Sequence, residues 1–133
     1  MIKQVIDVNG YWEIIVYYNV NYNLFGIIID DMAQSSTPVE GMDRVKYNLF
    51  IKGAKAVTIT FKDRHLSYII FRNHKSKEDY ISSIVHEAEH VKESMLEEYN
   101  VDNYGESPAY TIGYIVKELY SVFNKYVRVD ADL

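Results

Sequence analysis

The chain has 133 residues, with 14 Lys and Arg against 19 Asp and Glu, a net charge of −5, and no cysteine. This length suits a single domain, residues 1–133, which buries roughly two-thirds of its unfolded surface. The acidic balance and the lack of a Lys/Arg cluster argue against a nucleic-acid-binding protein. Without cysteine, any metal site must be built from His, Asp or Glu.

The sequence gives no sign of a membrane or export segment. Its first residues, Met1–Asp7, lack the apolar core of a signal peptide, and the longest apolar run, Leu24–Ile29, is too short to span a bilayer. We therefore expect a cytoplasmic protein with no membrane partner.

The first part of the chain, residues 1–73, reads as a strand-rich sheet. Asn9-Gly10 is a strong hairpin signal, because both positions tolerate positive φ. In the strand that follows, one face is uniformly apolar and the other mixed, which predicts a sheet covered on one side. Asp31–Asp43 reads as a loop. The predicted strands are Ile2–Val8, Tyr11–Val20, Leu24–Asp30, Arg44–Ile51, Lys55–Lys62 and Leu66–Arg72.

The second part, residues 76–126, switches to helical periodicity. Ser76 resembles an N-cap, and apolar residues then recur at spacings of three and four as far as Tyr99. A second helix is predicted to begin near Ser107-Pro108, because proline is favoured at the first helical position. The predicted fold class is α+β: a mostly antiparallel sheet followed by two packed helices.

The first of these helices contains His86-Glu87-Ala88-Glu89-His90, an H-E-x-x-H motif. Residues four apart lie on one helix face, about 6 Å apart along the axis, which lets two imidazoles bind one metal ion. Both histidines lie on a polar face, so the simpler interpretation is a solvated helix with two incidental histidines. The glutamate directly after the first histidine favours the metal interpretation, because zinc hydrolysis also needs a general base.

A catalytic zinc usually has three protein ligands, so a third is expected elsewhere. Glu93 shares the histidine face but lies about 10 Å along the axis from His86, too far to share its metal. His65 and His74 are expected at the surface. Glu106 is better placed, because it stands where the second helix begins and a short connection brings that end towards the first helix. The candidates are Glu106, preferred, with Asp102 and Glu118 as alternatives.

His86–His90 followed by Gly105-Glu106-Ser107-Pro108-Ala109-Tyr110 resembles the zincin-type metallopeptidases of the gluzincin-like kind. More closely, it resembles small uncharacterised phage and prophage proteins that pair H-E-x-x-H with a downstream E-x-x-A-Y. The resemblance implies a Zn²⁺ ion held by His86, His90 and Glu106, and hydrolysis of peptide bonds by a zinc-bound water that Glu87 activates. It also implies that Tyr110 donates a hydrogen bond to the oxyanion.

Two functional hypotheses follow. The first is a zinc-dependent peptidase acting on a protein or peptide, with an extended substrate added along the edge strand predicted at Leu66–Arg72. The second is a non-catalytic, phage-derived structural or binding protein that retains a metalloprotease-like fold. Substituting Glu87 by Gln separates the two, because it removes the base and keeps the metal ligands.

Overall fold

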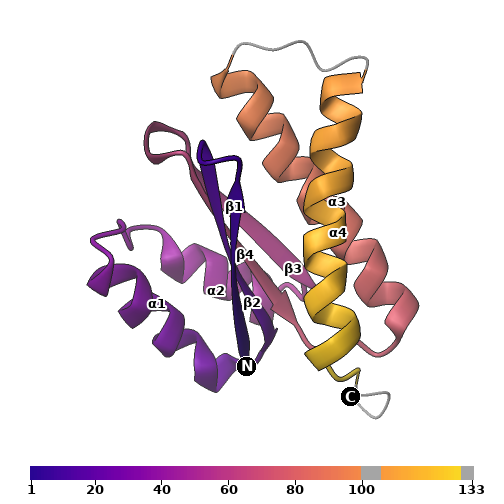
Figure 1. Ribbon diagram of the computed structural model, residues 1–133. Coiled ribbons are helices and arrows are strands. Elements are labelled where there is room, and N and C mark those ends of the chain that lie inside the picture. The colour runs from indigo at the N-terminus through magenta and orange to yellow at the C-terminus, as the bar shows by residue number, and fades with distance from the viewer. Residues whose placement is uncertain (100–105, 130–133) are drawn as a thin grey trace.

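The computed structural model describes residues 1–99 and 106–129, and at Glu106 only the backbone. A four-stranded sheet lies between two layers of helices, α1 and α2 on one face and α3 and α4 on the other (Figure 1). The α+β class is therefore confirmed. In chain order the elements are β1 (Ile2–Val8), β2 (Trp12–Val20), α1 (Phe25–Gln34), α2 (Met42–Phe50), β3 (Ala56–Phe61), β4 (Leu66–Arg72), α3 (Lys77–Glu98) and α4 (Glu106–Tyr126).

The strand order is β1-β2-β4-β3, so β1 and β3 form the two edges. The outer pairs, β1 with β2 and β3 with β4, are antiparallel, whereas the central pair of β2 and β4 is parallel. The prediction that Leu66–Arg72 is an edge strand is wrong, because β3 folds back along it and covers that side. The edge beside α3 is β3.

The hairpin predicted at Asn9-Gly10 is confirmed. Both residues have positive φ, 54° and 75°, and the Tyr11 N–H donates to the Val8 carbonyl at 3.0 Å, which closes a type I′ turn. Val8 pairs directly with Trp12, so the second strand begins one residue later than predicted.

Two predicted strands, Leu24–Asp30 and Arg44–Ile51, are wrong: apart from the end residues Leu24 and Ile51, these segments lie in α1 and α2. In α1 the buried residues are Phe25, Ile28 and Met32, which follow a helical spacing, and Asn21 accepts from the Leu24 N–H at the preceding 3₁₀ turn. A short apolar run has no decisive period of its own, so its composition does not distinguish a strand from a helix.

The two extra helices cover the face of the sheet that was expected to be open. Ile15 and Tyr17 of β2 are buried against α1, whereas Ile14, Val16 and Tyr18 are buried on the opposite face. The expectation of a sheet covered on one side is therefore wrong. Burial on both faces is typical of a central strand in a parallel pair.

Helix α3 begins where the sequence predicts. Ser76 is the N-cap residue, and its hydroxyl oxygen accepts from the Asp79 N–H at 3.1 Å. From there α3 crosses the sheet, and α4 returns beside it in the opposite direction (Figure 1). Ile84, Ala88 and Val91 of α3 are buried in this layer. Among the described residues, no helix is long and apolar enough to cross a membrane.

Candidate metal centre

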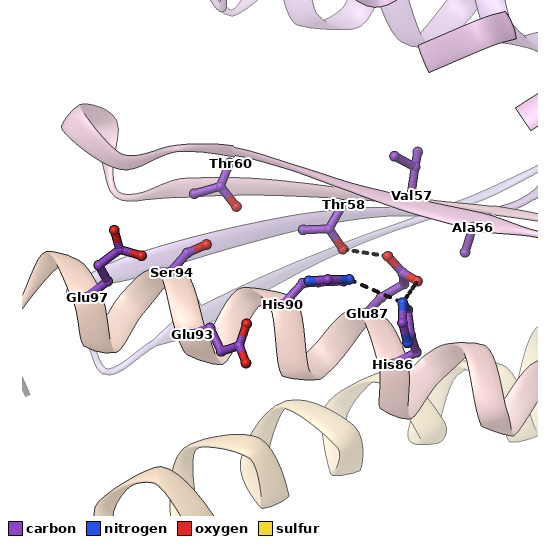
Figure 2. A pocket seen from close by; sticks show the side chains of 10 residues that line it. All are labelled: Ala56, Val57, Thr58, Thr60, His86, Glu87, His90, Glu93, Ser94 and Glu97. Atoms are coloured by element: carbon purple, nitrogen blue, oxygen red, sulfur yellow. Dashed lines mark hydrogen bonds and ion pairs between the residues drawn. The ribbon is translucent and has the colours of Figure 1, made fainter. Parts of the chain in front are cut away.

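The H-E-x-x-H motif lies near the middle of α3, facing β3. His86 and His90 project into a groove between α3 and β3, and Glu87 turns inward toward the strand (Figure 2). This arrangement follows from the helical period, because residues 86 and 90 share a face and residue 87 lies 100° further round. The motif therefore combines two exposed imidazoles with one sheltered carboxylate.

The two imidazoles meet through their Nε2 atoms. These atoms lie 3.1 Å apart, and the two rings are nearly perpendicular at 86°. Two nitrogens that each lie 2.0–2.1 Å from one tetrahedral zinc ion are separated by about 3.3 Å. The His86–His90 pair thus fits two ligand positions of such an ion with little adjustment.

Glu87 is held beside the histidines by the edge strand. It is 4% exposed, and its Oε1 accepts a 3.0 Å hydrogen bond from the Thr58 hydroxyl of β3. Its other oxygen, Oε2, lies 3.9 Å from His86 Nε2. Burial raises the pKa of the Glu87 carboxyl above its usual value, and the Thr58 hydrogen bond and the two histidines oppose that shift.

The groove around these residues has a volume of about 380 Å³ and is built only from α3 and β3. Beyond His90 its wall is acidic, with Glu93 and Glu97, and Glu97 pairs with Lys62 at 2.7 Å. On the strand side the lining is small and uncharged: Ala56, Val57, Thr58 and Thr60.

Among the described side chains, no group of three His, Asp or Glu residues is positioned to hold a metal ion. The preferred third ligand, Glu106, has no described side chain, and Asp102 lies outside the described residues. Glu118, the other alternative, lies near the far edge of the sheet, where its carbonyl accepts from Gln4 of β1 at 2.9 Å. Three strand spacings, about 14 Å, separate β1 from β3.

The structure also places Tyr110, His74 and Thr58 relative to the groove. Tyr110 lies on α4, is 73% exposed and does not line the groove. His74 was expected at the surface but is 2% exposed, because its ring packs on Tyr80 and hydrogen-bonds at both nitrogens. Thr58 was not singled out in the sequence, and no local pattern marks it, because its role depends on how β3 packs against α3.

Comparisons of the chain with protein-family models, with curated proteins and with solved structures give no match. The chemical interpretation therefore depends on the side chains of the groove themselves. They supply two converging imidazoles, a buried carboxylate and, within the described sheet, an edge strand in one place.

Proposed function

We propose that the chain is a cytoplasmic zinc-dependent peptidase that hydrolyses peptide bonds in a protein or peptide substrate. The observation that carries this proposal is the pair of Nε2 atoms of His86 and His90, 3.1 Å apart, with Glu87 directly beside them. This is the donor type and spacing that a catalytic zinc requires from a helix. The resemblance to gluzincin-like metallopeptidases supports the same activity.

The two histidines and the first glutamate of the motif have separate roles. His86 and His90 hold the metal, and Glu87, fixed by Thr58, accepts the proton of the attacking water and passes it to the leaving amine. Zinc, when bound, supplies a Lewis acid that polarises the substrate carbonyl and lowers the pKa of water. Glu106 as third ligand and Tyr110 as donor to the oxyanion stay predictions from the sequence.

The edge strand supplies a place for an extended substrate. The Arg72 N–H donates to the Lys55 carbonyl at 3.0 Å, so residues 55 and 72 form a hydrogen-bonded pair. Because such pairs alternate along an antiparallel ladder, the backbone groups of Ala56, Thr58 and Thr60 face away from β4. A substrate strand that pairs with these groups passes beside His86 and Glu87.

Metal content is the decisive first experiment. We expect about one equivalent of zinc in the protein, lost in His86→Ala and in His90→Ala. A folded protein that is purified without chelator and takes up no added zinc would refute the proposal.

Turnover is tested separately from metal binding. Glu87→Gln should keep the zinc and abolish hydrolysis of a denatured protein substrate, whereas Glu89→Gln, a change of the same kind within the motif, should keep both. Zinc bound by a wild-type protein that cleaves nothing would instead support a non-catalytic, phage-derived binding or structural protein. Equal cleavage by wild type and Glu87→Gln would exclude Glu87 as the base.

A further inference from the structure

A second and larger cavity, of about 680 Å³, lies at the end of the sheet where α3 begins. Its floor includes Val20 and Arg72, the last residues of the parallel strands β2 and β4. The carboxyl ends of parallel strands are where open α/β sheets bind ligands. Its volume is also within the usual range for small-molecule sites.

The cavity is basic, although the chain as a whole carries a net charge of −5. Its charged lining residues are Lys55, Arg72 and Lys75 against a single carboxylate, Asp79, so the formal balance is three minus one, or +2. Asp79 neutralises only part of this charge, through a 3.4 Å ion pair with Lys55. An anion entering the cavity therefore meets at least two cations, Arg72 and Lys75, that form no ion pair with a carboxylate of the described residues.

One wall of the cavity is aromatic. Tyr22 and Phe50 meet edge to face, with ring centroids 5.8 Å apart. Arg72 joins this wall to the basic floor, because its guanidinium lies 5.2 Å from the Phe50 ring centroid while Nη1 donates to the Leu49 carbonyl at 2.7 Å. The Lys46 ammonium lies 4.1 Å from the Tyr22 ring centroid and adds positive charge next to the wall.

One lining residue, Asn73, has a buried polar atom without a partner among the described residues. The Oδ1 atom of Asn73 is buried and makes no hydrogen bond with any described residue. Buried polar atoms are almost always hydrogen-bonded, so this oxygen has a partner that the described residues do not supply. Asn73 also lies three residues before the N-cap Ser76, so the positive end of the α3 dipole adds to the charge of this region.

We infer that this cavity binds a phosphate monoester joined to a flat ring, such as a nucleoside monophosphate. A phosphate monoester carries a charge of about −1.5 to −2 at neutral pH, which matches the +2 of the lining, whereas a carboxylate carries only one charge. Its three terminal oxygens accept hydrogen bonds from Arg72 and Lys75, and the ring packs against Tyr22 and Phe50.

Isothermal titration calorimetry with four probes tests the inference in the presence of a chelator, so that no metal ion contributes. Adenosine monophosphate should bind more tightly than about 1 mM. Inorganic phosphate, adenosine and benzoate should each bind at least about tenfold more weakly. Inorganic phosphate lacks the ring, adenosine lacks the phosphate, and benzoate lacks the second negative charge. No measurable binding of adenosine monophosphate would overturn the inference, and equal binding of benzoate would overturn the phosphate assignment.

Charge reversal locates the site. Lys55→Glu and Lys75→Glu each change a solvent-accessible side chain of the lining and should weaken binding of adenosine monophosphate by at least about tenfold. Lys117→Glu on α4 makes the same change in net charge outside the lining and should leave affinity unchanged. His86→Ala should also bind normally, which separates this site from the metal centre. An equal loss in Lys117→Glu and Lys75→Glu would show a non-specific charge effect and overturn the site.

Discussion

The Thr58 hydroxyl donates a 3.0 Å hydrogen bond to Glu87 Oε1, and this bond joins the edge strand β3 to the helix that carries both histidines. The same threonine belongs to the set of β3 residues whose backbone groups face away from β4. One residue therefore orients the proposed base and also borders the path of the proposed substrate. A change at Thr58 affects both.

Replacing Thr58 by Val should lower the free energy of unfolding by about 1–3 kcal/mol, because the buried Glu87 carboxylate loses its hydrogen-bond donor. Thr58→Ser keeps the hydroxyl and should stay within about 0.5 kcal/mol of wild type. Urea denaturation followed by circular dichroism measures both. A Thr58→Val protein with an unchanged urea midpoint would show that this bond contributes nothing to stability.

Replacing Ala56 by Pro should block strand addition without disrupting the sheet. Its N–H faces away from β4 and donates to no described residue, so proline removes a donor that is left for a substrate strand. We expect kcat/KM for a peptide substrate to fall at least about tenfold while the melting temperature changes little. In the matched variant Val57→Pro, the lost donor points to β4, so this protein should be strongly destabilised. Full activity in Ala56→Pro would place the substrate elsewhere.

His74 should make the fold sensitive to mild acid. Its Nδ1–H donates to the Arg72 carbonyl at 2.8 Å, and in the neutral ring Nε2 accepts from the Ser83 hydroxyl at 2.7 Å. Burial chiefly lowers the pKa of His74, with nearby Lys55 and Arg72 acting in the same direction and the Arg72 carbonyl and Asp79 opposing. In the unfolded chain His74 takes up a proton near pH 6.5, and in the fold it does so only at lower pH.

The contribution of His74 to the free energy of unfolding is therefore complete above about pH 6.5 and declines as the pH falls below that value. The free energy of unfolding of wild type should therefore drop between about pH 7.5 and 5.5 by more than that of His74→Asn, in which the titrating ring is absent. The other three histidines are common to both proteins and cancel in the comparison. Identical pH dependence in the two proteins would contradict a role for His74.

Ser67 should be important for the packing of the only tryptophan. Trp12 is 2% exposed, and its Nε1–H donates to the Ser67 hydroxyl at 3.1 Å. Ser67→Ala leaves that donor buried and unpaired and should cost about 1–3 kcal/mol, measured by urea denaturation with Trp12 fluorescence as the signal. Ser82→Ala, at an exposed position of α3, should be neutral. Equal stabilities of the two variants would disprove the cost assigned to the indole N–H.

The third ligand can be found by comparing zinc affinities. We expect Glu106→Ala to weaken zinc binding by about tenfold or more, since even residues outside the first coordination sphere cost 10–100-fold. Glu118→Ala should bind zinc normally, because that turn of α4 lies over β1. Competition with a chromophoric chelator measures both affinities. Normal affinity in Glu106→Ala would direct the search to Asp102.

The helix that carries the candidate site was predictable from the sequence because several independent signals agree there. Ser76 as a cap, acids in the first turn and a long apolar period all specify α3, and the structure begins and ends it within a residue of the prediction. Asn9-Gly10 specified the hairpin in the same way, through backbone angles that few residue pairs accept. In both cases residues close together in the sequence were enough to predict where the element lies.

What the sequence did not predict depends on contacts between distant segments. Leu24–Asp30 and Arg44–Ile51 are apolar enough for either a strand or a helix, and only their packing against β2 and β4 determines the outcome. The internal position of β4 and the Thr58–Glu87 bond have the same origin, because each joins parts of the chain that are far apart in sequence.

The parallel pairing of β2 with β4 has a kinetic consequence. Glu13 pairs with Leu66, 53 positions later, and α1, α2 and β3 all lie between these two strands. Closing so long a loop costs entropy before any contact compensates for it, and a high contact order slows folding. The β1–β2 and β3–β4 hairpins should therefore form early and the central pair late, which makes assembly of the sheet centre the rate-limiting event of folding.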